Sequence, residues 1–350
     1  MSFRLVINRS NFTMKTTNRL VEGGPSPAKK QAGRLRRLRP GDRVLVIRPG
    51  ALGDTILSLP SLQAVRRVVE GEGRIELVGY PTSLRVAVGP LHADSIHSID
   101  RARFAGLLSG EPAVDLQGFL EPFDIVVAWC SDRLGHLKGQ LELSGVPYLQ
   151  SRAFPDEGSR VHAADHLMRT LEPLGVVGRT PIPELDLPED SKTWARKLLS
   201  SESLVPGRFF VIHPGSGSSK KNWSSEKYAR LVHLATNHGL RVLLLEGQAD
   251  YEPVRRLLER VKVKLPVLSN LNLMAVAALI SEARMYVGND SGITHLAAAV
   301  GACTWALFGP TDPKLWAPRG RRVLVSSFEV EPDELWATIQ KVSANVGDCP

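Results

Sequence analysis

The stretch of residues 43–69 reads RVLVIRPGALGDTILSLPSLQAVRRVV and contains the pattern that decides the fold. Residues 43–48 are mostly β-branched and apolar, as in a strand that is buried on both faces of a parallel sheet. A glycine-containing turn follows, and from Asp54 onward apolar residues recur at helical spacing. The stretch therefore predicts a strand, a tight turn and a helix, which is the repeating unit of a doubly wound α/β domain.

The same alternation continues on both sides of residues 181–188 (PIPELDLP). Three prolines in eight residues exclude a helix interior or a central strand, so this stretch predicts an extended linker between two domains. Further strands are predicted at 75–79, 95–99, 124–129, 209–213, 241–246, 285–287 and 304–308. Further helices are predicted at 162–174, 226–238, 251–261, 273–283, 292–300 and 331–344. We expect a basic arm over 1–40, domains over 41–180 and 191–350, and a linker over 181–190.

Basic charge is concentrated before the first predicted strand. Residues 1–43 carry eleven basic and two acidic side chains, a net charge of +9, whereas the rest of the chain carries −1. The net charge of +8 therefore does not indicate a nucleic-acid-binding face on the folded part. We expect the arm either to contact an anionic membrane surface or to be a solvated leader, with Met14 as the alternative initiator. No apolar run approaches the length of a spanning helix, and no secretory signal follows the basic residues.

Three cysteines, Cys130, Cys303 and Cys349, are spread along the chain without the spacing of a metal site. This usage is typical of a reducing cytoplasm, so we expect free thiols, no structural zinc and a cytoplasmic location. His162 and His166 share one helix face, four residues apart, but no third ligand accompanies them. We expect no metal at this pair.

Three segments that each follow a predicted strand carry residues suited to a nucleotide. In residues 48–55 (RPGALGDT), the helix-start residue Asp54 is suited to accept a proton, and the glycines let a ligand approach the backbone. Residues 213–223 (HPGSGSSKKNW) offer small residues and lysines to phosphate oxygens, without P-loop spacing. Residues 287–299 (VGNDSGITHLAAA) place acidic and hydroxyl side chains at a helix start. Taken singly, each segment also fits a plain helix cap or a polar loop.

An acidic segment, residues 246–250 (EGQAD), follows the strand predicted at 241–246. Nucleotide-binding α/β domains often place an acid there against ribose hydroxyls, which makes Asp250 a candidate ribose contact and a solvated loop acid the alternative. The dinucleotide fingerprint fails at Gly50 and at Gly215, which disfavours a nicotinamide oxidoreductase.

The order of these motifs resembles glycosyltransferase family 9, the heptosyltransferase family of bacterial lipopolysaccharide synthesis. The resemblance covers residues 43–345 and rests on the Gly-Asp pair ending at Asp54, on Lys221 two residues before a tryptophan, and on NDSG…HLAAA…FGPT beginning at residue 289. It implies a GT-B fold, in which two Rossmann-like domains face each other across a cleft. It also implies an inverting, metal-independent glycosyltransferase that moves heptose from ADP-heptose to a lipid-anchored saccharide of the lipopolysaccharide core.

The resemblance further implies roles for individual residues. Asp54 is the expected general base, and Lys221 is expected to neutralise the diphosphate of the donor. The expected donor contacts are Ser216, Asp250, Asp290, Ser291, Gly292 and His295. The backbone expected to surround the phosphates is that of Gly50, Gly53, Gly215 and Gly217. We expect no cofactor and no metal, and a cytoplasmic enzyme that works at the inner face of the cytoplasmic membrane.

The chain departs from the family pattern at Gly50-Ala51, where many members carry hydroxyl residues that would contact phosphate. Two other functions stay open at this point. One is a glycosyltransferase of the same fold that uses another nucleotide sugar. The other is a non-catalytic protein that binds a saccharide or a nucleotide.

Overall fold

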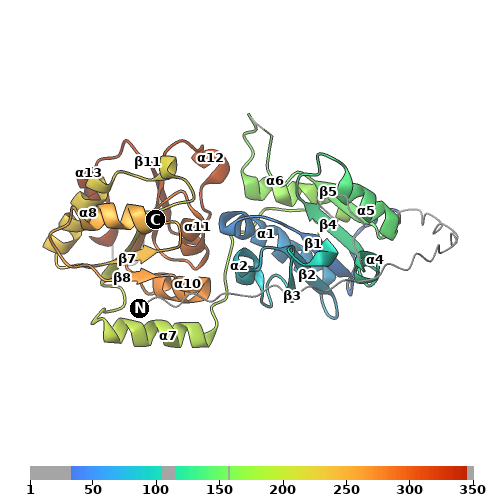
Figure 1. Cartoon of the computed structure of the whole chain (residues 1–350), viewed down its shortest axis with the longest axis horizontal. Helices are drawn as coiled ribbons and strands as arrows, with labels where there is room; N and C mark the ends of the chain where they lie inside the picture. The colour runs from blue at the N-terminus through green and yellow to red at the C-terminus, as the bar shows by residue number, and fades with distance from the viewer. Residues whose placement is uncertain (1–32, 105–114, 157, 345–350) are drawn as a thin grey trace, which may run out of the picture.

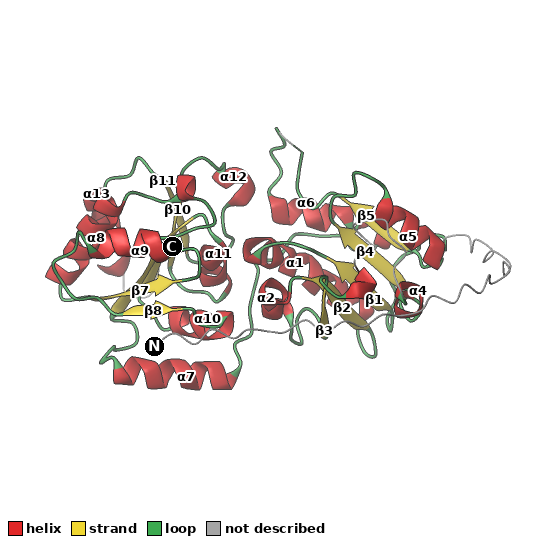
Figure 2. Cartoon of the chain, viewed as in Figure 1, coloured by secondary structure: helices red, strands yellow, loops and turns green. Residues whose placement is uncertain are grey.

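The computed structural model describes residues 33–104, 115–156 and 158–344, which form two parallel-sheet α/β domains (Figures 1 and 2). The sheet of the N-terminal domain has the order β3-β2-β1-β4-β5, with every neighbouring pair parallel. Its strands are β1 (Arg43–Ile47), β2 (Arg74–Gly79), β3 (Ser95–Ser98), β4 (Ile125–Trp129) and β5 (Tyr148–Ser151). Its helices are α1 (Leu52–Val69), α2 (Pro81–Leu84), α4 (Leu116–Leu120), α5 (His136–Ser144) and α6 (Ala163–Thr170).

The sheet of the C-terminal domain has the order β11-β10-β9-β6-β7-β8 and is also parallel. Its strands are β6 (Phe209–His213), β7 (Arg241–Glu246), β8 (Val267–Ser269), β9 (Met285–Asn289), β10 (Thr304–Phe308) and β11 (Val323–Ser327). Its helices are α7 (Glu189–Ser201), α8 (Ser225–Asn237), α9 (Tyr251–Leu258), α10 (Leu273–Ser281), α11 (Gly292–Ala299), α12 (Pro313–Trp316) and α13 (Pro332–Ala344).

Strand β1 shows why the apolar run at its position folds as a central strand. Successive side chains point to opposite faces, so Val44 and Val46 join the core under α1 and α6. Leu45 and Ile47 join a second core under α4 and α5. Because both faces are covered, each of these side chains is buried and contributes about 1.5–3 kcal/mol of hydrophobic free energy.

The core under α1 extends into the C-terminal domain. Phe209 and Val211 of β6, together with apolar residues of α10 and α11, belong to the same cluster as the α1 side chains. The opposite face of this sheet packs Phe210 and Ile212 against α8, α9 and α13. Helices α1 and α11 face each other between the two domains (Figure 1). Apolar packing across this contact holds the domains together.

The structure confirms the predicted strand–helix alternation and shifts several element bounds. Helix α1 begins at Leu52 instead of Asp54, and α6 ends at Thr170, before a 3₁₀ turn at Glu172–Leu174. The linker region has no helix or strand between that turn and α7, and Leu185 N donates to Ala299 O at 3.1 Å. Helices α2, α4, α5, α7 and α12 and strands β5, β8 and β11 were not among the predicted elements.

The predicted arm of residues 1–40 ends too late. Leu38 is buried in the N-terminal core, and Leu38 N donates to Leu174 O at 2.9 Å. Arg36 forms a 2.8 Å ion pair with Asp42. Residues 33–40 therefore belong to the domain because their side chains and backbone are bonded to it. Residues 1–32 lie outside the described part of the chain.

Two further expectations concern the cysteine thiols and membrane-spanning helices. Cys130 is buried and carries a free thiol, whereas Cys303 is disulfide-bonded, so the expectation of free thiols is wrong at Cys303. No helix of the described residues is long and apolar enough to cross a membrane.

Candidate active site

The three predicted nucleotide segments follow β1, the central strand of the N-terminal sheet, and β6 and β9, which are adjacent in the C-terminal sheet. In parallel sheets the carboxyl ends of the strands share one edge, and ligands bind at that edge. The N-terminal domain contributes the start of α1. The C-terminal domain contributes the loop at 214–224 and the start of α11. The candidate site is therefore built from both domains.

Asp54 stands in the first turn of α1, three residues after the N-cap residue Ala51. Its Oδ2 accepts a 2.9 Å hydrogen bond from Ala51 N, which holds the carboxylate at the helix start. A Cβ at Gly50 would lie 2.8 Å from the Cβ of Asp54, so glycine there leaves room for this return. The Asp54 side chain stays 22% exposed, which keeps it open to a substrate.

Arg48, at the end of β1, was not singled out by the sequence. Its side chain is only 3% exposed, and its Nη2 lies 3.7 Å from Asp54 Oδ1 and 3.4 Å from Asp54 O. Its guanidinium also lies over the ring of Phe154, and its Nε has no partner among the described residues. Burial lowers the pKa of Arg48, and the nearby Asp54 carboxylate opposes that shift. The candidate base thus has a buried cation behind it.

The starts of α1 and α11 meet at two glycines. A Cβ at Gly53 would lie 3.2 Å from Cδ2 of His295, and a Cβ at Gly292 would lie 2.8 Å from the Cβ of Leu52. Only residues without side chains allow the two helix starts to approach so closely. Each helix N-terminus carries free N–H groups and a partial positive charge. Their junction is a favourable place for an anion such as a phosphate.

Lys221 and Asp290 lie together in the C-terminal domain beside this junction. Lys221 Nζ donates to Asp290 Oδ2 at 2.7 Å, and Thr311 Oγ1 donates to the same oxygen at 2.6 Å. The Asp290 side chain is buried, whereas that of Lys221 is about one third exposed. Asp290 therefore fixes the ammonium group where an arriving phosphate could reach it.

Asn289, the last residue of β9, ties the Gly/Ser/Lys-rich loop to the sheet. Its Nδ2 donates to Pro214 O at 2.8 Å, and its Oδ1 accepts from Trp223 N at 2.9 Å and from Tyr228 Oη at 3.0 Å. The side chain is fully buried. It stands inside the NDSG motif, but its structural role depends on a loop more than sixty residues away.

Ser216 forms hydrogen bonds within the Gly/Ser/Lys-rich loop. Its Oγ lies 2.7 Å from both Ser218 O and Asn222 Oδ1, and the residue is buried. Its contact with donor phosphate stays a prediction. A Cβ at Gly217 would meet nothing within 4 Å, so its backbone is open to a ligand.

Asp250 does not point its carboxylate outward. Oδ2 accepts from His213 Nε2 and from Gly247 N, both at 2.8 Å. A Cβ at Gly215 would lie only 1.8 Å from Oδ1, so the loop backbone covers the other oxygen. Burial acts to raise the pKa of Asp250, but the bonds from His213 and Gly247 lower it overall. The expected ribose contact of Asp250 stays a prediction, and the observed partners are protein groups.

A crevice of about 100 Å³ opens at the ends of β6, β7 and β8. Aliphatic side chains form much of its wall, together with the polar residues His213, Glu246 and Asp250. Apolar walls with a few polar groups suit contact with a nucleobase, but the crevice is smaller than the roughly 300–1,000 Å³ of a whole ligand pocket, so it would hold only part of a nucleotide. The crevice is lined by His213, Leu245, Glu246, Gly247, Asp250, Leu268, Asn270, Leu271, Leu273, Val276 and Ile293.

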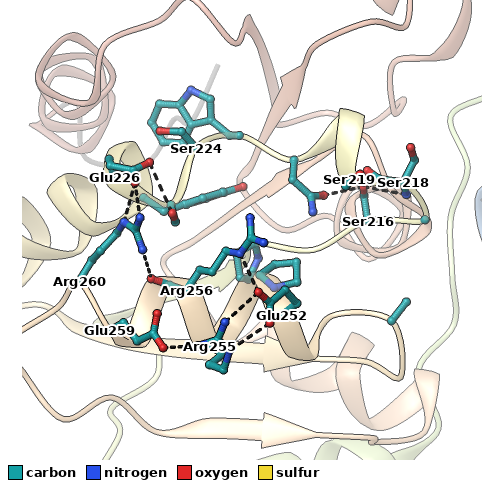
Figure 3. A pocket seen from close by; sticks show the side chains of 18 residues that line it. Ser216, Ser218, Ser219, Ser224, Glu226, Glu252, Arg255, Arg256, Glu259 and Arg260 are labelled. Carbon is teal, nitrogen blue, oxygen red and sulfur yellow. Dashed lines mark hydrogen bonds and ion pairs between the residues drawn. The ribbon is translucent and has the colours of Figure 1, made fainter.

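A larger pocket of about 720 Å³ lies between the Gly/Ser/Lys-rich loop at 214–224 and α9 (Figure 3). Its guanidinium groups are already paired: Arg255 and Arg256 contact Glu252, and Arg260 contacts Glu226. Lys221 and Asp290 are not among its lining residues. Because its charges are neutralised by each other, this pocket is less suited to a diphosphate than the helix junction is.

His295 is buried at the helix junction. Burial lowers its pKa to about 4, so the imidazole is neutral near pH 7, and its Nδ1 has no partner in the described chain. His162 and His166 act separately: His162 Nε2 lies 2.9 Å from Ala317 O, and His166 Nε2 lies 2.9 Å from Arg152 O. No group of three or more His, Cys, Asp or Glu side chains that could hold a metal ion occurs among the residues with described positions.

The contact of His162 with Ala317 belongs to a set of bonds between the domains, which we call the latch. Asp165 of α6 forms a two-pronged ion pair with Arg319, and Phe154 packs edge-on against Trp316 at 5.4 Å between ring centroids. Helices α6 and α12, which carry Asp165 and Trp316, lie at the upper side of the two domains in Figure 1.

Comparison with known proteins identifies similar chains. Residues 142–336 match the sequence model of glycosyltransferase family 9 (heptosyltransferase), a match that begins after Asp54. Lipopolysaccharide heptosyltransferase 1 of Salmonella typhimurium is 22% identical over 304 residues, covering 80% of this chain and 92% of that protein. Lipopolysaccharide heptosyltransferase 1 of Pseudomonas aeruginosa is 26% identical over 299 residues, covering 80% and 82%.

Solved structures of similar fold include two bacterial transferases. A family 9 glycosyl transferase from Veillonella parvula has a TM-score of 0.73 at 20% identity, with 87% of this chain and 97% of that chain covered. The E. coli ADP-heptose lipopolysaccharide heptosyltransferase II has a TM-score of 0.68 at 19% identity, with 85% and 98% covered. Together with the two parallel sheets, these structures confirm the predicted GT-B fold class.

Proposed function

The chain belongs to glycosyltransferase family 9 and is a glycosyltransferase, and from this premise we propose that it moves heptose from ADP-heptose to the saccharide core of lipopolysaccharide. The proposal includes inversion at the anomeric carbon and no need for a metal ion. The observation that carries it is the Lys221–Asp290 pair beside the junction of α1 and α11. The names of the Salmonella and Pseudomonas relatives support heptose as the sugar.

The site suits the departure of a nucleoside diphosphate. As the bond between the anomeric carbon and the diphosphate breaks, negative charge develops on the leaving oxygen. The Lys221 ammonium and the free N–H groups of the two helix starts stabilise that charge. When Lys221 turns to phosphate, Asp290 keeps its bond from Thr311 and gains a free acceptor for a sugar hydroxyl. The aliphatic crevice at the ends of β6, β7 and β8 takes the base.

Asp54 is the proposed general base. It removes the proton of the acceptor hydroxyl while the hydroxyl oxygen bonds to the anomeric carbon, and the diphosphate leaves from the opposite face, which inverts the configuration. Replacing Asp54 with Asn keeps the shape and should lower transfer by about 10²–10⁴-fold while ADP binding stays intact. Transfer close to that of the wild type would contradict this role.

The experiment that tests the proposed donor is calorimetric titration with ADP, UDP, GDP and CDP in the presence of EDTA. We expect selective binding of ADP without metal and weaker binding in Lys221→Ala. Lys220→Ala is the matched control, since Lys220 is an exposed neighbour that lies outside the pair with Asp290. A preference for UDP or GDP would keep the transferase and change the donor. Absence of any nucleotide binding would favour a non-catalytic saccharide-binding protein.

We further propose that the basic residues before Gly33 draw the protein to the anionic inner surface of the cytoplasmic membrane. Residues 1–32 hold six Lys and Arg side chains and one Glu, and each cation near such a surface contributes about 1 kcal/mol. Deleting residues 1–32 should weaken sedimentation with anionic vesicles and leave turnover of soluble substrates unchanged. If the full chain and the chain without residues 1–32 sedimented equally with the vesicles, residues 1–32 would instead be a solvated leader.

A further inference from the structure

His213, the last residue of β6, lies between two residues of the proposed donor site. Its Nε2 is 2.8 Å from Asp250 Oδ2, and its Nδ1 is 3.5 Å from Ser291 Oγ. The His213 and Asp250 side chains are 4% and 8% exposed. The three residues come from the ends of β6, β7 and β9, so only the folded sheet brings them together.

The carboxylate of Asp250 is fixed from three sides. Gly247 N and His213 Nε2 bond the same oxygen, and the backbone of Gly215 packs against the other. These bonds hold the pKa of Asp250 below its usual value, so the group is ionised and can only accept. The His213 proton must therefore sit on Nε2. In the neutral ring this leaves Nδ1 as an acceptor toward Ser291.

Ser291 is the N-cap residue of α11, but its hydroxyl makes no bond to the helix backbone. It lies between His213 Nδ1 and Thr294 Oγ1, which is 3.2 Å away. Thr294 uses its own proton on Asn289 O. Tyr286 also hydrogen-bonds with Ser291. A Ser291 proton donated to His213, with one lone pair of Ser291 Oγ used by Tyr286, leaves the second lone pair to accept a further hydrogen bond.

The position of Ser291 indicates which hydroxyl it would accept from. Its neighbour Asp290 holds Lys221, where the phosphates are expected, and its partner His213 lines the crevice expected to hold the base. The ribose of a nucleotide lies between base and phosphates. Ser291 is thus placed at the ribose.

We propose that Asp250 and His213 are positioning residues that fix the direction of the Ser291 hydroxyl, so that Ser291 Oγ accepts a hydrogen bond from a ribose hydroxyl of the donor. The ligand class is a nucleoside diphosphate with free ribose hydroxyls. This inference rests on the proposed function. It replaces the direct ribose contact of Asp250 with an indirect one, through His213 and Ser291.

The test compares ADP with 2′,3′-dideoxy-ADP by calorimetry. One hydrogen bond corresponds to about a tenfold preference of the wild type for ADP. Ser291→Ala and Asp250→Ala should each reduce the preference to about threefold or less, and the double variant should show no further loss. Because both ligands are measured on the same variant, a smaller folded fraction does not change the ratio. Single variants that keep the wild-type preference, or effects that multiply in the double variant, would overturn the inference.

Two further variants separate positioning from loss of stability. Asp250→Asn should keep most of the preference, since an amide oxygen accepts the same bonds from His213 and Gly247. Asp42→Ala removes an equally buried carboxylate from the other domain and should lower the melting temperature without changing the preference. An Asn variant as poor as Asp250→Ala would overturn the positioning role.

The outcomes for the wild type keep the two proposals distinguishable. Binding of ADP and dideoxy-ADP with equal affinity would overturn the inference and leave the proposed function standing. Failure to bind ADP at all would overturn the proposed donor, and the inference with it.

Discussion

His92 is buried in the N-terminal domain, away from the candidate site, with 4% of its surface exposed. Burial, assisted by the positive charge of Arg66, lowers its pKa from 6.5 to about 4. In the unfolded chain His92 therefore becomes protonated near pH 6.5, whereas in the folded chain it becomes protonated only near pH 4. The free energy of unfolding must fall as pH drops through this window, by about 1.4 kcal/mol per pH unit for this residue.

Replacing His92 with Gln should flatten this acid dependence. Between pH 7.5 and pH 4.5 the variant should lose about 2–3 kcal/mol less unfolding free energy than the wild type. Urea unfolding at the two pH values measures the difference, and His238→Gln, at an exposed histidine, is the control. Equal losses in wild type and variant would show that His92 takes up its proton in the folded state as well.

At this scale the sequence predicted residues whose roles follow from local position. Asp54 in a first helical turn follows from the strand–turn–helix pattern. The pairing of Lys221 with Asp290 does not, because 69 residues separate them and only the sheet order brings them together. The inward turn of Asp250 was also beyond the sequence, since it depends on Gly215 in a different loop.

At the scale of elements, the contact of α1 with α11 depends on glycine. Replacing Gly292 with Ala would place a Cβ 2.8 Å from the Cβ of Leu52 and 3.1 Å from Gly53 N, so the helices must separate. We expect transfer to fall by about 10–100-fold, because a shift of about 1 Å between base and donor has effects of this size. ADP affinity should fall less than transfer does, since the start of α1 moves away from the phosphates while Lys221 and the other donor contacts of the C-terminal domain stay in place.

Steady-state kinetics and calorimetry check the Gly292→Ala prediction. Gly139→Ala in α5 is the control, because a Cβ there meets nothing within 4 Å and alanine favours a helix. If Gly292→Ala lost ADP binding and kept its turnover per bound donor, the contact would serve the donor pocket instead of the approach of the two domains.

The sequence predicted the buried central strands and missed most of the partly exposed edge strands, with β3 as the exception. Central strands such as β1 and β6 read as continuous apolar runs because both faces are covered. Strands β5 and β8 stand at sheet edges and are partly exposed, so their residues give no such run. Helix α7 buries only Ala195 and Leu199, which leaves too weak a periodicity to recognise.

At the scale of the whole molecule, the latch supplements the helix contact. Arg319→Met removes the ion pair with Asp165, a partly exposed bond worth about 1 kcal/mol, so the share of molecules with the domains together should fall. We expect turnover to drop by up to about fivefold, the limit set by a loss of about 1 kcal/mol, while ADP affinity stays the same. The matched control is Arg321→Met, which removes a more exposed pair with Glu184. Equal kinetics in both variants would show that the Arg319 pair does not help to hold the domains together.

Although α7 begins at Glu189, inside the predicted linker of residues 181–190, the sequence also predicted two doubly wound domains, because repeated alternation is a local signal. It did not predict how the domains meet. The latch joins residues about 150 positions apart in the sequence. The sequence around Gly53 and Gly292 is that of ordinary turn glycines, and nothing in it indicates that the two helix starts are in contact. The docking of residues 33–40 was missed because their basic composition hides the buried Leu38.

In the described part of the chain, the backbone passes between the domains once, through the stretch between Gly175 and Pro188. All the side chains that are expected to contact the donor lie after this crossing, and the candidate base lies before it. Recombination between Gly175 and Pro188 would therefore replace the whole C-terminal domain, with its donor-contacting side chains, in one step. Such a chimera would have to keep only two matched surfaces, the glycine contact and the latch. Sugar choice and acceptor choice could then diverge separately during evolution.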